Sequence, residues 1–317
     1  MKIETHQVVK GFIFCLTTAV GLSGNVLIIL SLANIAHQEK KMVPTDVILS
    51  ILVGANLTLL LTLGLPHSLF VFGVKYFYAD LDCKFNGLLM RASRVMTIGL
   101  TCLLSCYQGA TLASSNPMWA VVKVKLQNYL ISIIILLLIL SIISSLSSGL
   151  YPVVSANMTT LKHAFNMGYC ISIYPSKFLF ELIGFVAFAR DAVFVILMAL
   201  SSVFIIFILR KHAKQMKGKR RSDRTQETTA EQQASKMIVT FVTIYVLLFG
   251  IENIIWFCQV SIDSENLAAL NDTRVFLAFC FSTLFPFVLI AFNKKVKSNL
   301  KCLVINCCKG HLSYSAH

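Results

Sequence analysis

Long runs of apolar residues alternate with short polar stretches along the whole chain. Seven runs are long enough to cross a membrane, since a spanning helix needs about 20 residues at 1.5 Å rise per residue. They cover Val8–Leu32, Thr45–Phe72, Phe85–Leu112, Asn128–Leu150, Phe178–Leu209, Ser235–Val260 and Leu270–Phe292. The pattern predicts an all-α membrane protein, in which a bundle of seven transmembrane helices forms one domain over residues 1–317.

The composition excludes an ordinary soluble protein. Hydrophobic residues make up 56% of the chain and charged residues 13%, and the mean hydropathy is +0.76. Soluble domains average about 45–50% apolar and about 25% charged residues. A net charge of +14 would suggest nucleic-acid binding in a soluble protein. Here the basic residues gather in alternate loops, so no nucleic-acid partner is expected.

Lysine and arginine predict the orientation of the bundle. The loops 34–44, 113–127 and 210–236 and the short tail 293–317 hold 18 of the 28 basic residues, and the opposite side holds 7. The positive-inside rule therefore places the N-terminus outside the cell and the tail in the cytoplasm. The basic run in the loop 210–236 serves either as a topology signal attracted to anionic lipid or as a surface for a partner protein.

Cysteine and asparagine positions agree with this topology. Among ten cysteines, only Cys83 and Cys170 fall on the predicted outer side. Because that side is oxidising, we expect a disulfide between them. The same outer loop carries Asn157-Met-Thr, an acceptor for N-glycosylation. A second acceptor, Asn271-Asp-Thr, lies close to the end of a span and is the weaker candidate.

Seven spans are compatible with a receptor, a transporter or channel, or a membrane enzyme. The seven histidines are scattered, and the chain contains no H-E-x-x-H, Gly-x-Ser-x-Gly or glycine-rich phosphate loop. We therefore predict no catalytic residues, no metal site and no cofactor. The carboxylates Glu181, Asp191 and Glu252 keep a proton-coupled transporter open as an alternative. The absence of an internal repeat counts against transporter folds built from inverted halves.

Several motifs in the third, fifth and seventh runs favour a receptor. The third run carries Arg91 and Arg94 three residues apart, then "CLLS…Q" from Cys102 to Gln108, and is followed by "NPMWAVVK". The fifth run contains Arg190-Asp191, and the seventh contains "FPFVL". From about residue 24 to 293, this set resembles the vomeronasal type 1 receptors, pheromone receptors distantly related to rhodopsin-like receptors.

The resemblance implies a G-protein-coupled chemosensory receptor of rhodopsin-like architecture. Such a receptor binds a small pheromone or odorant and activates a heterotrimeric G protein of the Gi/Go type, in the plasma membrane of chemosensory neurons. It would place Gln108, Lys211 and Lys214 on the G-protein side. The stretch "ATLASSNP" departs from the family's usual "AITISP", and such differences favour a fish-type member. Bitter taste receptors are the competing receptor family, but their pattern around the third run is absent.

The two arginines of the third run identify a candidate ligand site. An arginine near the middle of a bilayer costs at least about 2.5–3.5 kcal/mol, and such groups normally face the bundle interior or a water-filled cavity. Residues three apart share a helix face, so both arginines point the same way. The resemblance implies that this level faces the ligand cavity. The candidate ligand-binding residues are Met90, Arg91, Arg94, Arg190, Asp191, Glu252, Trp256 and Phe276.

Two interpretations of these arginines remain open at this point. They form internal ion pairs with the carboxylates, or they bind an anionic ligand, because a guanidinium matches a carboxylate bidentately. Arg94 lies deeper than Arg91, so we expect it to contribute more to ligand binding. Arg190 and Asp191 point about 100° apart on a helix and are expected to reach different neighbours.

Overall fold

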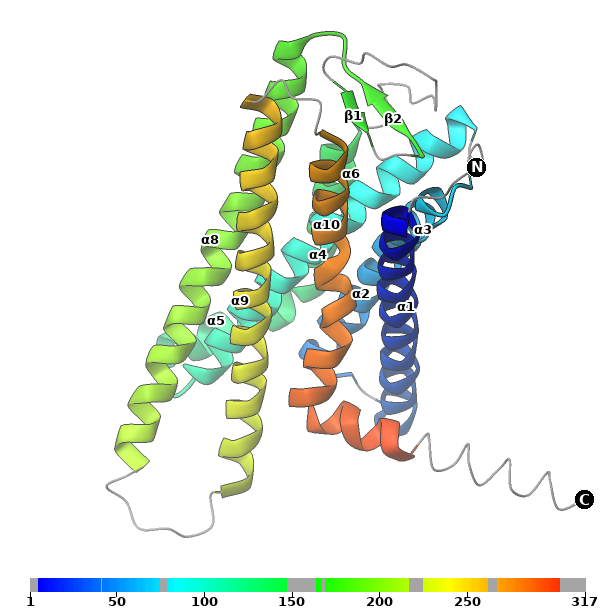
Figure 1. Cartoon of the computed structure of the whole chain (residues 1–317). Helices are drawn as coiled ribbons and strands as arrows, with labels where there is room; N and C mark the ends of the chain where they lie inside the picture. The colour runs from blue at the N-terminus through cyan, green and yellow to red at the C-terminus, as the bar shows by residue number, and fades with distance from the viewer. Residues whose placement is uncertain are drawn as a thin grey trace, which may run out of the picture.

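The fold is a bundle of long helices with one pair of short strands at one end (Figure 1). The computed structural model describes residues 5–40, 42–74, 79–146, 164–166, 169–216, 225–261 and 267–302. Its helices are α1 Thr5–Glu39, α2 Pro44–Leu59, the π-helical turn η1 Leu60–Gly64, α3 Leu65–Val71, α4 Asp80–Leu112, α5 Pro117–Asn128, α6 Leu130–Ser145, α8 Lys177–Met216, α9 Thr225–Ser261 and α10 Leu267–Phe292. Strands β1 Ala164–Asn166 and β2 Ile171–Ile173 pair antiparallel. We call their end of the bundle the strand end.

Every apolar run predicted to span the membrane contains a helix. Within the described residues, six helical segments are long and apolar enough to cross a membrane, and α5 with α6 makes a seventh if this bent pair is one span. The region 113–127, predicted to be a loop, is mostly the helix α5, which meets α6 at an angle of 63°. Its start is well specified, because Pro117 occupies the first turn and the Asn116 side chain accepts from the Met118 N–H at 3.1 Å.

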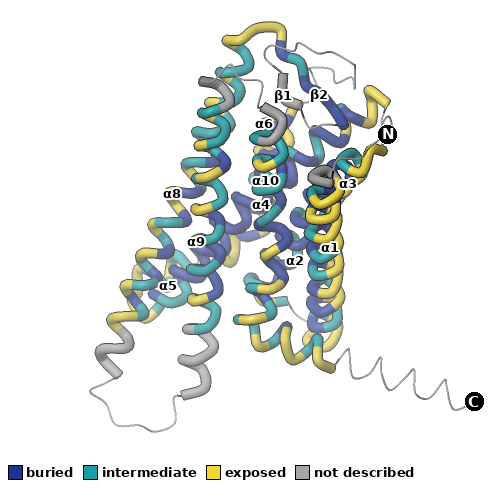
Figure 2. The backbone as a smooth tube through the Cα atoms, in the orientation of Figure 1, coloured by how far each residue is buried: buried dark blue, intermediate teal, exposed yellow. Residues whose placement is uncertain are grey.

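Helix α4 is the centre of the bundle (Figure 2). In its most apolar stretch 83% of the residues are buried inside the protein, against 28% in α1 and in α8. Large apolar side chains on the outer helices remain exposed, as expected where lipid replaces water as the solvent. Arg91 and Arg94 of α4 are consequently half-buried inside the bundle, and this determines where the functional site lies.

A buried polar cluster joins four helices at mid-height. Pro286 in α10 has no N–H, so the carbonyl of Ser282 loses its helical donor. The Asn25 Nδ2 of α1 donates to that carbonyl at 2.9 Å. The hydroxyls of Ser282 and Thr97 donate to Asn56 Oδ1 at 3.0 and 3.3 Å. These bonds hold α1, α2, α4 and α10 together where the apolar interior offers few other partners.

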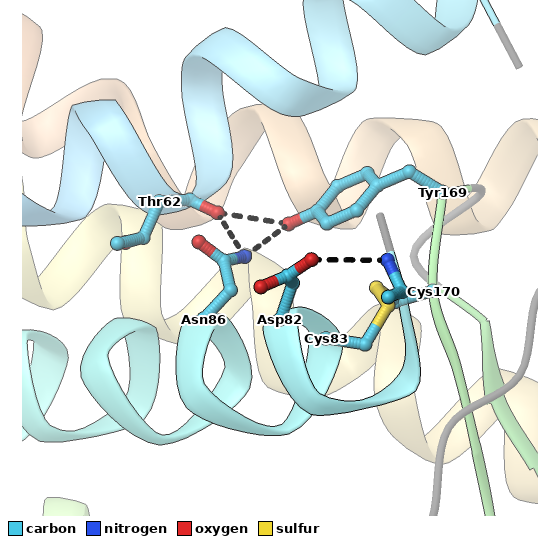
Figure 3. Close-up of a disulfide and its surroundings, with 7 residues drawn as sticks. Thr62, Asp82, Cys83, Asn86, Tyr169 and Cys170 are labelled. Atoms are coloured by element: carbon cyan, nitrogen blue, oxygen red, sulfur yellow. Dashed lines mark hydrogen bonds between the residues drawn. A yellow bond between two sulfur atoms is a disulfide. The ribbon is translucent and has the colours of Figure 1, made fainter. Parts of the chain in front are cut away.

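A second proline organises the strand end. Pro66 cannot donate to the carbonyl of Thr62 four residues earlier, and the chain widens into the π-helical turn η1 at this point. Figure 3 shows the replacements: Asn86 Nδ2 of α4 donates to the Thr62 carbonyl at 2.8 Å, and the Tyr169 hydroxyl donates to it at 2.9 Å. The bend of the second span is thus bonded to α4 and to the loop that carries the strands.

The predicted disulfide is confirmed. Cys83, in the first turn of α4, is bonded to Cys170, which immediately precedes β2, and their Cα atoms lie 6.0 Å apart (Figure 3). Cys83 and Cys170 are both buried. The bond holds β2 against the strand end of α4, next to the contact that Tyr169 makes with the second span.

At the opposite end, the start of the predicted cytoplasmic tail docks on α1 and α2. Residues 294–302 are helical, and Lys295 Nζ contacts Glu39 Oε2 at 2.7 Å and Asp46 Oδ2 at 3.0 Å. Burial opposes the charge of Lys295, but the hydrogen bonds to both carboxylates outweigh it and raise the pKa of the lysine. The tail therefore begins as an anchored helix; residues 303–317 lie outside the described residues.

Candidate ligand-binding site

A cavity of about 420 Å³ lies among α4, α8, α9 and α10 at the strand end. This volume falls within the range of about 300–1,000 Å³ typical of small-molecule sites. Seven of the eight predicted ligand-binding residues line it, namely Met90, Arg91, Arg94, Arg190, Asp191, Glu252 and Trp256. Phe276 is the exception: its ring packs against Phe14 at 5.5 Å and Phe279 at 5.7 Å. Hydropathy could not distinguish these two faces of α10.

Arg94 forms a bidentate ion pair across the cavity with Glu252. Its Nη1 and Nη2 atoms each lie 2.6 Å from one Glu252 carboxylate oxygen, which joins α4 to α9. Its Nε lies 4.0 Å from Asp191 Oδ2 on α8. The Glu252 side chain is 9% exposed, and that of Arg94 is 25% exposed. Of the two interpretations of the arginines, internal ion pairing therefore holds for Arg94, whose guanidinium is not left for a ligand alone.

Arg190 pairs with its neighbour Asp191, contrary to the expectation that the two would reach different partners. Both Nε and Nη2 of Arg190 lie 2.7 Å from Asp191 Oδ1. The prediction considered only the directions in which the two Cα–Cβ bonds leave the helix. The long arginine side chain folds back over α8, because both groups are largely enclosed by protein and a buried charge needs a partner.

Arg274 is a charged residue of the cavity that the sequence interpretation missed. It lies near the outer end of the predicted seventh run, Leu270–Phe292, and α10, which begins at Leu267, carries it into the bundle. Its Nε lies 3.9 Å from Glu252 Oε1, so Glu252 faces arginines from α4 and from α10. The same rule that selected Arg91 could have identified it, because a charge within an apolar run normally faces the interior.

Residues next to β2 close the strand end of the cavity. Arg91 Nη2 donates to the Tyr174 hydroxyl at 3.1 Å, and the Tyr174 ring meets the edge of Phe180 at 5.5 Å. Tyr174 is buried, and both aromatic residues line the cavity. Since Cys170 fixes the other end of β2, the segment 170–174 is held at both ends. Tyr174 lies in a loop, which carries no hydropathy signal, and Phe180 is one of many apolar residues of the fifth run, so neither aromatic residue was predicted.

The apolar wall of the cavity depends on a glycine. Trp256 of α9 packs so closely on Gly184 of α8 that a Cβ at residue 184 would lie 2.5 Å from its Cζ2 atom. Only glycine permits this approach without a shift of the indole ring. Phe188 continues the wall and stacks on Phe249 with ring centroids 6.0 Å apart. The site therefore combines charged residues on α4, α8, α9 and α10 with an aromatic wall on α8 and α9.

The remaining predicted residues lie away from the cavity. Gln108 is buried near the tail end of α4, and Lys211 is exposed near the corresponding end of α8. Lys214 belongs to α8, but its side chain is outside the described part of the structure. The predicted glycosylation site Asn157 also lies outside the described residues.

A bundle of membrane-spanning helices with a disulfide-anchored strand beside a charged interior cavity defines a seven-transmembrane receptor architecture. Comparison with known proteins identifies the family. Residues 8–302 match the model of the "Vomeronasal organ pheromone receptor family", and the chain belongs to this family of receptors.

Individual relatives span almost the same length. The chain is 31% identical over 295 residues to "Olfactory receptor class A-like protein 1" of Danio rerio, covering 93% of this chain and 92% of that protein. It is 28% identical over 279 residues to "Vomeronasal type-1 receptor 4" of Homo sapiens, covering 88% and 92%. It is 25% identical over 298 residues to "Vomeronasal type-1 receptor 90" of Rattus norvegicus, covering 93% and 94%. The resemblance to vomeronasal type 1 receptors is thereby confirmed.

Proposed function

We propose that this protein is a chemosensory G-protein-coupled receptor that binds a small pheromone or odorant in the cavity among α4, α8, α9 and α10. The observation that carries the proposal is the cavity itself, which is charged on one side, aromatic on the other, and bounded by a strand that a disulfide holds. The chain is not an enzyme. It lies in the plasma membrane of chemosensory neurons, with the N-terminus outside and the tail in the cytoplasm.

The proposed mechanism is a shift between two arrangements of the bundle. The cavity is lined by residues of four helices, so a ligand there contacts elements that can move relative to one another. It favours the active arrangement only by the difference between its affinities for the two states. The tail ends of α8 and α9, which extend beyond the other helices in Figure 1, would then engage a heterotrimeric G protein of the Gi/Go type.

A ligand panel in transfected cells tests this proposal. Acids, amines, steroids and neutral odorants are applied side by side with a calcium or cyclic-nucleotide readout, and pertussis toxin is added to block Gi/Go proteins. The variant Ala187→Trp fills the cavity, and Val203→Trp adds the same bulk on the lipid-facing side of α8, where Val203 is 65% exposed. We expect a toxin-sensitive response that Ala187→Trp abolishes and Val203→Trp retains at equal surface density.

The alternatives give different results. Movement of a solute in a flux assay, without a second-messenger response, would instead support a transporter. The topology is tested separately: an epitope after Lys309 should label only in permeabilised cells, and Asn157 should carry a glycan. Labelling of the tail on intact cells would contradict the orientation and, with it, coupling to a cytoplasmic G protein.

A further inference from the structure

A second cavity, which we call the small chamber, lies among α2, η1, α4, α9 and α10. Its volume is about 50 Å³. It adjoins the larger cavity of about 420 Å³, because four residues line both, namely Met90, Arg94, Glu252 and Arg274. The ion pair between Arg94 and Glu252, which joins α4 to α9, therefore stands where the two cavities meet. A ligand that extends from the larger cavity into the small chamber passes beside this pair.

The residues that line the small chamber alone are apolar. They are Leu59 at the end of α2, Leu63 in η1, and Val275 and Ala278 on α10. Leu59, Leu63 and Val275 are buried and belong to the same apolar cluster as Met90. The small chamber thus has apolar walls and a charged entrance. Such a chamber takes an apolar group without charge, because a buried charge needs a partner.

The volumes set the size of the group that fits. Benzene, with six carbons, occupies an engineered apolar cavity of about 150 Å³, which corresponds to about 25 Å³ per carbon. On this scale the small chamber takes about two carbons, and the larger cavity takes about seventeen non-hydrogen atoms. A methyl or ethyl group therefore fits the small chamber, whereas a ring fits only the larger cavity.

Water gains little from the small chamber. A buried water typically makes about three hydrogen bonds, and the four side chains that line the chamber alone offer none. At the entrance, Arg94 and Glu252 already bond each other at 2.6 Å. An alkyl group that displaces poorly bonded water gains affinity, so the geometry favours an apolar occupant.

We propose that the small chamber is a subsite that selects ligands by the length of an alkyl arm. The ligand has an aromatic or alicyclic body, which lies against the wall of Phe188 and Trp256, and an uncharged arm whose last one or two carbons enter the chamber. The flexible side chain of Met90 adapts as the arm passes. Val275 and Ala278 determine specificity, since they bound the chamber. This inference rests on the proposed function, because it names the ligand class of the same receptor.

The test uses purified full-length receptor in lipid nanodiscs and follows its thermal unfolding with a series of alkyl phenyl ketones. The phenyl ring suits the aromatic wall, and the carbonyl can accept from Arg94, because a guanidinium has five N–H donors. The alkyl chain is lengthened one carbon at a time, from methyl to octyl. We expect the stabilisation to increase up to one chain length and to fall beyond it. Each carbon that enters the small chamber should raise the affinity about fourfold.

Two variants change the small chamber in opposite directions. Ala278→Val adds two carbons to its wall and should shorten the preferred chain by about two carbons, whereas Val275→Ala removes two and should lengthen it by about two. The control Ala291→Val adds the same bulk at an exposed position near the other end of α10 and should leave the preferred chain unchanged. Each variant is compared with its own unfolding temperature without ligand, so a change in stability alone does not move the preferred length.

Partition of the ketones into lipid increases steadily with chain length and affects every variant alike, so the shift between variants reports the small chamber. Three results would overturn the inference: no stabilisation by any ketone, stabilisation without a preferred length, or the same preferred length in Ala278→Val as in the parent. If Ala278→Val does not fold, an unchanged preferred length in Val275→Ala overturns it equally.

A failure of the proposed function gives a different result. A preferred chain length that the two chamber variants shift, without any second-messenger response, would contradict the receptor function and leave the subsite intact. Ligand-evoked signalling in cells, with one preferred length in all variants, would retain the receptor and remove the subsite.

Discussion

Replacing Arg94 with methionine and Glu252 with glutamine tests whether their ion pair holds α4 to α9. Methionine keeps much of the apolar stem of arginine, and glutamine keeps the shape of glutamate, so each change mainly removes a charge. The double variant removes both charges and completes a double-mutant cycle. The coupling energy of the pair is the change in the free energy of unfolding in the double variant minus the sum of the changes in the two single variants.

The structure sets the expected magnitude. Removing one partner of a buried ion pair typically costs about 3–5 kcal/mol, because the other charge is left uncompensated. Here each survivor retains a second partner: Arg94 has Asp191 at 4.0 Å, and Glu252 has Arg274 at 3.9 Å. The Arg94 side chain is also 25% exposed. We therefore expect the free energy of unfolding to fall by about 2–3 kcal/mol in each single variant, with a coupling of about 1–3 kcal/mol.

The free energy of unfolding is measured in mixed micelles, using fluorescence of the two tryptophans. The matched control is the pair Lys177–Glu181 on α8, whose atoms lie 3.7 Å apart with side chains 65% and 42% exposed. The same double-mutant cycle at this exposed pair should give a coupling energy of at most about 0.5 kcal/mol. A coupling between Arg94 and Glu252 no larger than that of the control would refute the reasoning, and so would normal stability of Arg94→Met.

Three further predictions address the strand end and the aromatic wall. Cys170→Ser breaks the bond to Cys83 and should lower the stability of the receptor by about 2–5 kcal/mol. Its surface density should therefore fall strongly, and equal labelling of this variant on intact and on permeabilised cells would contradict the prediction. Asn86→Ala removes one of two donors to the carbonyl that Pro66 leaves open and should lower the free energy of unfolding by only about 1 kcal/mol. Gly184→Ala forces the indole beside it to shift and should weaken agonist potency more than thermal stability, whereas unchanged potency would show that the ring is not part of the site.

Hydropathy predicted the membrane spans because each one is a long, nearly uninterrupted apolar segment. It failed for α5, where "PMWAVVKVKLQN" alternates apolar and charged residues and no single face dominates. The signals for that helix are local, an asparagine cap followed by a proline, and neither contributes to an average over many residues. Hydropathy also underestimated the lengths of helices, since α9 begins at Thr225 and the predicted run begins at Ser235.

The candidate site was predictable wherever a charge interrupted an apolar run. That rule found both arginines of α4 and the carboxylate of α9 that one of them binds. It could not predict which charges pair, because pairing depends on the distances between helices. Arg190 folds back onto Asp191. Arg274 also interrupts an apolar run, but it stands near the end of that run, and only the structure shows that it faces the cavity. Tyr174 reaches the cavity through a loop fixed by the disulfide, and no local pattern reports such a long-range contact.

The carbonyl of Thr62 has a consequence for the evolution of the receptor. It accepts from Asn86 and Tyr169 because a proline stands four residues later, so three positions distant in the sequence share one hydrogen-bonding requirement. A relative with another amino acid at position 66 would regain the helical N–H, and the carbonyl would no longer select for the asparagine and the tyrosine. Substitutions at these positions should therefore be inherited together, and a chimera that exchanges the second span alone should fold less well than one that also exchanges the other two residues.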